Sequence, residues 1–288
     1  MTASRYVPPA LRPLEAAKAV YRGPRDALAA MGHLITFLVR SIAAVPLAFR
    51  HYSKEVWRLL ADVAWGNGAI VVGGGTVGVM VILGIMGGAT VGIEGYTALN
   101  LLGMSPVTGG LSAFATTREI APLLAATAFT AQSGCRFTAQ LGSMRIAEEI
   151  DALEAIAIRP LPYLVTTRMC AAVLAIIPLY SVSLAANYLA CQFMFMLQSG
   201  QGEGTYLYYF NQFLVSWDML FSFFKVIVFV LLTTFIQCYY GYFASGGPEG
   251  VGVAAGHAIR LAIIVIVFAN LVMTLVFWGT SPGIKISG

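Results

Sequence analysis

The sequence predicts an all-α integral membrane protein with an N-terminal interfacial amphipathic helix, five transmembrane helices, and a cytoplasmic helix between the second and third spans. Of its 288 residues, 58% are hydrophobic and only 10% are charged, and the mean hydropathy is +0.79. A soluble domain carries about 25% charged residues, so most of this chain cannot face water. Apolar stretches of about 20 residues recur, the length that a helix needs to cross a bilayer. They lack the polar–apolar alternation of transmembrane β-strands.

The N-terminal part of the chain is predicted to lie outside the membrane core. Residues 1–26 contain Pro and Arg and are expected to form a poorly ordered cytoplasmic extension. Residues 27–49 are apolar but interrupted by His33, Arg40 and Pro46. This pattern favours a helix lying in the interface, with its charged side chains extending toward the head groups. A true span over the same residues is the alternative.

Five spans are predicted downstream, and a tail follows them. In the first span, Gly84, Gly88 and Gly92 have the small-xxx-small spacing that lets helices approach closely. The spans and the tail cover about residues 69–91, 120–141, 169–197, 219–243, 259–278 and 280–288.

The distribution of positive charge predicts the orientation. Nine of the 17 Lys and Arg residues precede Gly66. With the N-terminus in the cytoplasm, thirteen cations lie on the inner side and only Arg118 and Lys285 on the outer side, as the positive-inside rule requires. The tail 280–288 then faces outward. The net charge of +4 therefore reflects orientation in a plasma (inner) membrane and does not indicate nucleic-acid binding.

The predicted inner loop 142–160 is acidic, against the usual tendency. Its acids are Glu148, Glu149, Asp151 and Glu154, and Met144, Ile146, Ile150, Leu153 and Ile156 fall at helical spacing. The pattern predicts a short amphipathic helix that ends before Pro160. Such a helix suits a protein partner better than anionic lipid, and a solvated connector is the alternative.

Two charged residues fall inside predicted spans. Lys225 lies about two turns into the fourth span, and Arg136 lies near the inner end of the second. Burying a cation in hydrocarbon costs at least ~2.5 kcal/mol, so each should have a partner or a cavity. Snorkelling toward the interface is the alternative. Glu119 could instead complete a helix N-terminus, where acids are favoured.

Signatures of catalysis and metal binding are absent from the sequence. His33, His51 and His257 are far apart, and the four cysteines have no metal or redox spacing. The sequence has no Gly-x-x-x-x-Gly-Lys-Ser/Thr phosphate loop and no hydrolase signature. We therefore expect no cofactor, no metal site and no catalytic residues in this chain, with any ATP and Mg²⁺ bound by a partner.

Several segments together resemble a known family. They are Leu141–Met144, Glu148–Leu153, Pro160, Tyr163-Leu164 and Arg168, with Arg118-Glu119 and Pro122 upstream and Gly246–Gly252 downstream. These segments resemble the signature of the MlaE/YrbE permeases, the membrane subunits of ABC transporters that work with MCE-domain proteins. The resemblance covers roughly residues 27–279. The extended N-terminus and Ser133–Thr138 are similar to the B-type YrbE subunit of actinobacterial Mce systems.

The resemblance implies a permease that moves lipids, fatty acids or related molecules, by import. It implies an A-type YrbE permease partner, a cytoplasmic ABC ATPase dimer and MCE-domain proteins on the outer face. Arg118, Glu119 and Lys225 would then hold an anionic lipid head group, with Glu119 orienting Arg118 in the empty pocket. The ATPase-coupling residues would be Met144, Glu148, Glu149, Ile150, Asp151 and Leu153, and Pro248, Glu249 and Gly250 would form a second cytoplasmic loop.

The chain departs from the family pattern at Gln132, Gln140 and Asn270, where ionisable residues are frequent. In a heterodimer the other permease could supply these charges. Two other classes of function remain open from the residues alone. One is a membrane-embedded lipid-modifying enzyme with Arg118, Glu119 and Lys225 as its polar centre, and the other is a structural membrane scaffold.

Overall fold

The computed structural model describes residues 32–64, 66, 75–200 and 202–279. The predicted extension 1–26, residues 27–31, residues 69–74 of the first span and the tail 280–288 lie outside this range. The chain divides into two units, Met1–Ala44 and Val45–Gly288. In the first unit the described residues form one helix, Gly32–Ala43, where the Ser41 hydroxyl donates a hydrogen bond to the Phe37 carbonyl.

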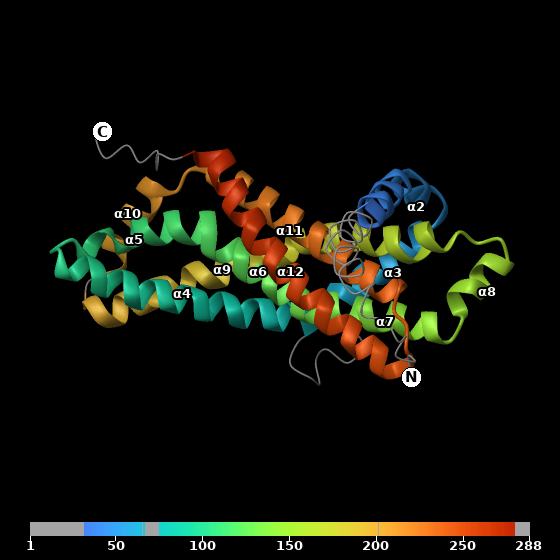
Figure 1. The fold of residues 1–288 in the computed structure, drawn as a ribbon. Helices are drawn as coiled ribbons and strands as arrows, with labels where there is room; N and C mark the ends of the chain where they lie inside the picture. The colour runs from blue at the N-terminus through green and yellow to red at the C-terminus, as the bar shows by residue number, and fades with distance from the viewer. Residues whose placement is uncertain (1–31, 65, 67–74, 201, 280–288) are drawn as a thin grey trace, which may run out of the picture. The chain divides into compact units, whose positions relative to one another are not determined.

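The second unit contains only helices and their connections in its described residues (Figure 1). In chain order they are α2 (Val45–His51), α3 (Ser53–Ala64), α4 (Gly75–Leu101), η2 (Ser105–Val107), α5 (Thr108–Leu111), η3 (Ser112–Ile120), α6 (Ala121–Phe129), η4 (Thr130–Gly134), α7 (Cys135–Ile146), α8 (Glu149–Ala155), η5 (Leu161–Thr166), α9 (Thr167–Ser199), α10 (Glu203–Phe213), α11 (Ser216–Tyr242) and α12 (Gly247–Trp278).

Four of the helical segments are long and apolar enough to cross a membrane: Gly75–Leu101, Leu161–Ser199, Ser216–Tyr242 and Gly247–Trp278. Gly32–Ala43 and Val45–His51 would add a fifth if they formed one span, so that alternative stays open. The chain is therefore an all-α, multi-pass membrane protein, as its composition predicted. The helices run past the predicted ends of the spans, because hydropathy marks only the part of a helix that suits hydrocarbon.

The predicted span 120–141 lies inside a helical run from Thr108 to Ile146 that is interrupted by two π-helical segments. The segments η3 and η4 are π-helical, whereas α5, α6 and α7 are α-helical. A π-helix bonds each N–H five residues back, so its turns are wider than α-helical turns and it is frequently found at functional sites. Because the run begins at Thr108, Arg118 and Glu119 lie within it and not at its N-terminus.

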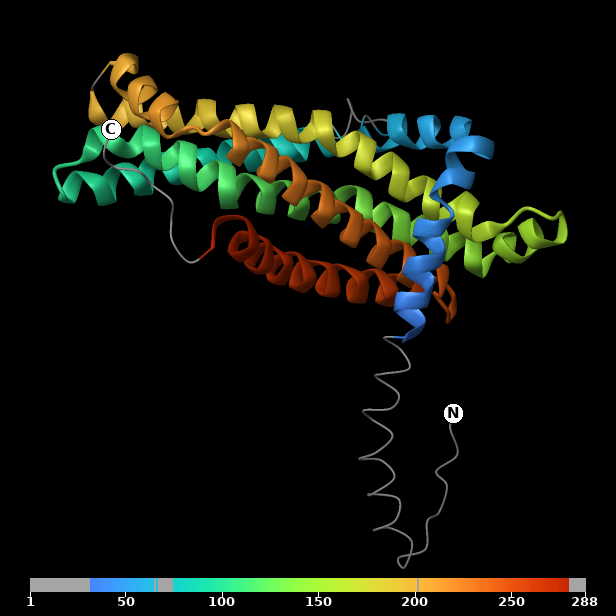
Figure 2. The same cartoon turned by 90° about the horizontal axis from the view of Figure 1, so that it is seen from above.

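Close packing of α4 against α9 uses the glycines that the sequence singled out (Figures 1 and 2). A Cβ atom on Gly88 would lie 2.0 Å from the Asn187 carbonyl oxygen, and one on Gly84 would lie 2.6 Å from that of Ser183. No other residue fits at this separation, which confirms the prediction from the glycine spacing. The Ser183 hydroxyl also donates to the Met80 carbonyl, 2.8 Å away.

The helix α12 differs from α9 in how little of it is covered within the unit. Only Ala258, Ala262 and Ile266 are buried among its 32 residues, whereas α9 buries fifteen of 33. Large apolar side chains such as Phe268 and Val276 are 67% and 73% exposed. This face of α12 is therefore available to lipid or to another membrane helix.

Candidate functional site

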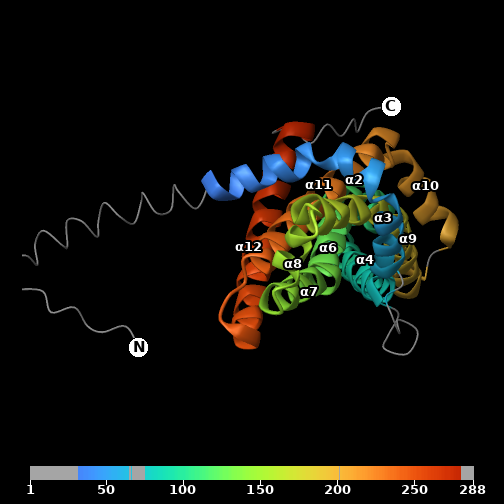
Figure 3. The same cartoon turned by 90° about the vertical axis from the view of Figure 1, so that its right-hand side faces the viewer.

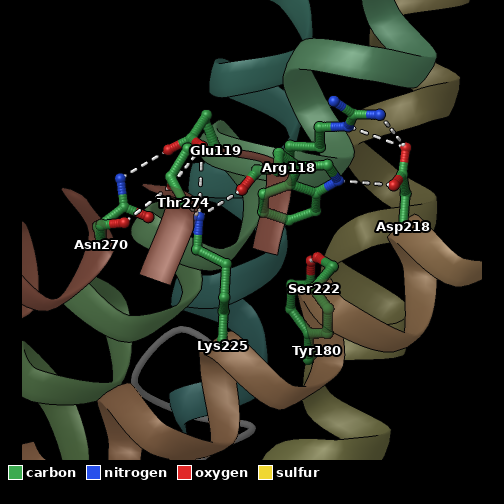
Figure 4. Close-up of polar contacts among 9 residues, drawn as sticks. Arg118, Glu119, Tyr180, Asp218, Ser222, Lys225, Asn270 and Thr274 are labelled. Atoms are coloured by element: carbon green, nitrogen blue, oxygen red, sulfur yellow. Dashed lines mark hydrogen bonds and ion pairs between the residues drawn. The ribbon is translucent and has the colours of Figure 1, made fainter. Parts of the chain in front are cut away.

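The candidate site lies where η3 passes the first turns of α11 and the last turns of α12 (Figure 4). Arg118 and Glu119 are consecutive residues of η3, and their side chains contact different helices. Arg118 pairs with Asp218 of α11, whereas Glu119 bonds to Asn270 and Thr274 of α12. We refer to Arg118, Glu119, Asp218, Lys225, Asn270 and Thr274 as the η3 cluster.

The Arg118–Asp218 ion pair is buried, with Arg118 8% and Asp218 6% exposed. The Arg118 Nε and Nη2 atoms lie 2.9 Å and 2.8 Å from Asp218 Oδ2. The other carboxylate oxygen accepts a hydrogen bond from the Trp278 indole N–H at 2.8 Å. The Arg118 guanidinium also lies 4.2 Å from the centre of the Phe114 ring. Both charges are therefore paired and hydrogen-bonded, as burial requires.

Lys225 is fully buried in the middle of the cluster. Its ammonium donates to the Arg118 carbonyl at 2.7 Å and to Thr274 Oγ1 at 2.9 Å, and it lies 3.4 Å from Glu119 Oε1. Glu119 also accepts hydrogen bonds from Asn270 Nδ2 at 2.7 Å and from Thr274 Oγ1 at 2.6 Å. The Glu119 side chain is 37% exposed, so it is the accessible member of the pair.

This geometry corrects three interpretations of the sequence. Glu119 does not orient Arg118, because the guanidinium pairs with Asp218, which Trp278 holds in turn by a hydrogen bond. Glu119 does not complete a helix N-terminus, because η3 continues α5. Lys225 does not snorkel, since its ammonium is buried and bonded inside the helix bundle. The structure places the three predicted residues together, with Lys225 contacting both of the others.

A shallow groove of about 690 Å³ begins at the η3 cluster and follows α12. Glu119, Asn270 and Thr274 form its polar end, and Ile263, Ile264, Val267, Phe268 and Leu271 form its apolar walls. Asn270 Oδ1 has no hydrogen-bond donor among the described residues. A second groove of about 430 Å³, with only apolar lining, shares Ile264 and Phe268 with the first. A polar end that continues into an apolar path has the form of a binding place for a head group and its acyl chain.

The predicted coupling residues lie at the opposite end of the second unit from α5 and α10, on and beside α8 (Figure 1). They do not form one helix over 142–160. Met144 and Ile146 end α7, and the backbone turns at Glu148, which has a φ of 58°, before α8 starts. Ile150 is 1% exposed and fixes α8 to the unit, whereas Glu148, Glu149 and Asp151 are exposed.

Two further contacts define this end. The Arg145 guanidinium lies 2.8 Å from Asp151 Oδ1 across the turn between α7 and α8. The predicted second loop is the first turn of α12, where Pro248 and Glu249 are exposed. Gly250 is required there, because a Cβ atom would lie 1.8 Å from the Ser245 carbonyl oxygen. Neighbouring Val251 packs against Gly142 of α7, which links this turn to the helix that leads into α8.

Comparison with known proteins decides the family. The family model for permease MlaE matches residues 66–276, most of the chain. The chain belongs to the MlaE permease family. This MlaE-family chain is 30% identical over 179 residues to a probable ABC transporter permease protein of Synechocystis sp., covering 62% of this chain and 68% of the relative.

Other relatives of this MlaE-family chain have more specific names. It is 26% identical over 203 residues to the intermembrane phospholipid transport system permease protein MlaE of Haemophilus influenzae, covering 70% of this chain and 77% of that protein. It is also 26% identical over 215 residues to the chloroplastic protein TRIGALACTOSYLDIACYLGLYCEROL 1 of Arabidopsis thaliana, covering 73% and 60% respectively.

Sequence reasoning missed several members of the site in this MlaE-family chain. Asp218, Thr274 and Trp278 carried no predicted role, although Trp278 ends the fifth predicted span and Asp218 directly precedes the fourth. Helical spacing could have found them, because residues four apart share one face of a helix. Asn270, Thr274 and Trp278 follow each other at intervals of four, and Asp218 lies two turns before Lys225.

Proposed function

We propose that this chain is the membrane-spanning permease subunit of an ABC transporter that moves lipid across the cell membrane. The observation that carries the proposal is the family match over residues 66–276, together with relatives named as ABC transporter permeases. The printed sequence has no phosphate loop. We therefore assign ATP and Mg²⁺ to a separate cytoplasmic ATPase dimer.

The lipid site that we propose is the groove along α12 with the η3 cluster at its polar end. The ion pair between Lys225 Nζ and Glu119 Oε1, 3.4 Å long, is looser than the other two contacts of the ammonium, at 2.7 Å and 2.9 Å. A fatty-acid carboxylate is the same chemical group as the Glu119 side chain. It can replace Glu119 on Lys225 while its chain lies along Val267, Phe268 and Leu271. Arg118 then does not contact the lipid. Its carbonyl accepts a hydrogen bond from Lys225, and its ion pair with Asp218 holds η3 in place.

A second permease on the exposed face of α12 completes this site in the proposal. The groove is open along one side, and the apolar residues that line it are exposed. A partner helix there would cover both the groove and the acyl chain. The resemblance to B-type YrbE subunits supports an A-type YrbE permease as that partner. It also supports MCE-domain proteins on the outer face, import as the direction, and a cytoplasmic N-terminus.

The ATPase would dock at α8 and at the first turn of α12. Glu148 and Glu149 are exposed there and form no ion pair with any described residue, and Ile150 anchors α8 to the bundle. The packing of Val251 on Gly142 joins the two docking segments mechanically. A movement of α8 would therefore be transmitted through α7 to α12 and to the groove along it. Such transmission requires that the packed helices switch between two conformations.

Affinity purification of the full chain from native membranes tests the proposal. We expect an ABC ATPase, a second permease and bound lipid to co-purify, and ATP hydrolysis by the complex to drive lipid movement between vesicles. A chain that purifies without an ATPase and chemically alters lipid by itself would establish the enzyme alternative instead.

A further inference from the structure

A separate cavity lies at the other end of the unit, between α3, α7 and the start of α9. Figure 3 looks at this end and shows α3 lying against α9. The cavity has a volume of about 740 Å³, well within the range of small-molecule sites. Among the described residues it is lined by Arg58, Leu59, Ala61, Asp62, Gly66, Arg136, Gln140, Ser143, Met144 and Arg168. None of them belongs to the η3 cluster.

The lining carries three arginines but a single carboxylate, and that carboxylate is already used. Arg136 Nη2 lies 2.8 Å from each oxygen of Asp62, and Arg136 Nη1 donates to the Asp62 carbonyl at 3.1 Å. This pair joins α7 to α3 and gives Arg136 the partner that its position in a membrane helix requires. Arg58 pairs with Glu55 on α3, and its side chain remains 74% exposed.

Arg168 has no such partner among the described residues, although it is only 6% exposed. Its Nη1 donates to the Leu164 carbonyl at 2.7 Å, and its Nη2 lies 3.4 Å from Gln140 Oε1. Its Nε has no acceptor, and no carboxylate among the described residues forms an ion pair with it. A guanidinium stays charged in proteins, and buried charges are normally paired. The cavity therefore offers a buried guanidinium N–H to an anionic ligand.

We propose that the cavity binds the phosphate of an anionic lipid head group, with Arg168 as its innermost ligand and Arg58 at its mouth. Guanidinium groups match the tetrahedral oxygens of phosphate with paired hydrogen bonds. The wall formed by α3 favours a lipid as the source. Val56 and Leu59 bury one face of α3 against Cys170 and Ala171, while Trp57 is 64% exposed. Exposed Trp beside cations is typical of a helix at head-group depth.

The test uses the full chain in nanodiscs of phosphatidylcholine, with and without phosphatidylglycerol. Bound phosphatidylglycerol is counted by native mass spectrometry, and thermal stability is measured in parallel. We expect Arg168→Gln to weaken phosphatidylglycerol binding about tenfold, the usual scale for one charge-assisted hydrogen bond. Arg159→Gln is the matched control, because Arg159 is exposed, does not line the cavity, and makes the same change in charge. It should bind as the unaltered chain does.

Stability in pure phosphatidylcholine gives a second, independent readout. There Arg168→Gln should unfold at a higher temperature than the unaltered chain, because it removes an uncompensated charge.

If Arg168→Gln does not fold, Arg58→Gln on the exposed mouth carries the binding test. Equal phosphatidylglycerol binding by all variants would overturn the site. Stabilisation by inorganic phosphate alone, with no lipid preference, would overturn the lipid assignment. If phosphatidylglycerol binding depended on Arg168 only when the ATPase is bound, the cavity would be part of the contact with that protein, and the lipid site would again be overturned.

Discussion

The Lys225 ammonium lies 3.4 Å from the Glu119 carboxylate, although Lys225 is fully buried and the Glu119 side chain is 37% exposed. The charge of Lys225 is thus balanced by a carboxylate that lines the groove. Its other two contacts, the Arg118 carbonyl and the Thr274 hydroxyl, are uncharged. Glu119 is therefore the only carboxylate that pairs with Lys225 among the described residues, and it stands where a ligand in the groove would meet the lysine.

Removing one partner of the buried Arg118–Asp218 pair should strongly destabilise the chain. We expect Asp218→Ala to cost about 3–5 kcal/mol, because it leaves a buried guanidinium unpaired. Asp151→Ala breaks the exposed pair with Arg145 and should cost no more than about 1 kcal/mol. Unfolding of both variants in the same detergent, followed by circular dichroism, gives the comparison. Equal losses would mean that burial adds nothing to the Arg118 pair.

The separation of α4 and α9 should tolerate no side chain at Gly88. A Cβ atom there would lie 2.0 Å from a backbone oxygen, which cannot move aside as a flexible side chain can. Gly88→Ala should therefore destabilise the chain by at least the ~1–3 kcal/mol of ordinary overpacking. Gly252→Ala is the control, because Gly252 is in α12 with open space around it. Helix propensity predicts a gain of up to about 1 kcal/mol there, and thermal unfolding measures both.

Docking of the ATPase should depend on the exposed acids of α8. Glu148→Lys with Glu149→Lys reverses two charges and should release the ATPase during purification while the permease stays inserted, since like charges at an interface cost several kcal/mol. The matched control is Glu94→Lys with Glu203→Lys, two exposed acids on α4 and α10. Retention of the ATPase by the α8 variant would show that these acids do not dock it.

The predicted orientation can be tested from two exposed positions at opposite ends of the second unit. In a background with the four cysteines replaced, Ser143→Cys should react with an impermeant reagent only from the cytoplasmic side. Gly204→Cys on α10, where open space surrounds the residue, should react only from outside. The basis is the excess of cations on the predicted inner side. Labelling of both positions from one side would refute this topology.

Much of the fold could be predicted because it follows from composition and spacing. Apolar runs identified the four segments that are long and apolar enough to cross a membrane, and the Gly84–Gly88–Gly92 spacing identified the face of α4 that packs on α9. The π-helical segments η3, η4 and η5 could not be predicted, since no residue pattern fixes a five-residue hydrogen bond. The change of winding at η3 sets the directions of Arg118 and Glu119, so their partners were assigned wrongly.

The departures at Gln140 and Asn270 became interpretable only in three dimensions. Asn270 donates to Glu119 at 2.7 Å, a hydrogen bond that a carboxylate in its place could not provide. Gln140 offers its amide oxygen to Arg168 at 3.4 Å, without the charge of a glutamate. Sequence spacing cannot give these contacts, because each joins helices far apart in the chain. The neutral amide at position 140 leaves Arg168 without an ion pair among the described residues.

Removing the charge of Lys225 and removing the charge of Glu119 should change the affinity for a fatty acid in opposite directions. If a fatty-acid carboxylate replaces Glu119 on Lys225, then Lys225→Met removes the cation that both compete for. We expect its affinity for a long-chain fatty acid to fall about tenfold or more, the scale of a charge-assisted hydrogen bond. Glu119→Gln removes the competitor and should raise the affinity, because the lysine is then left without a carboxylate until the ligand arrives.

Lys54→Met is the control, since Lys54 is exposed on α3 and outside the cluster. Isothermal titration of oleate into the purified complex measures all three variants. A purely structural cluster predicts a different pattern, in which Lys225→Met and Glu119→Gln both lower thermal stability while oleate affinity stays equal to that of the unaltered chain.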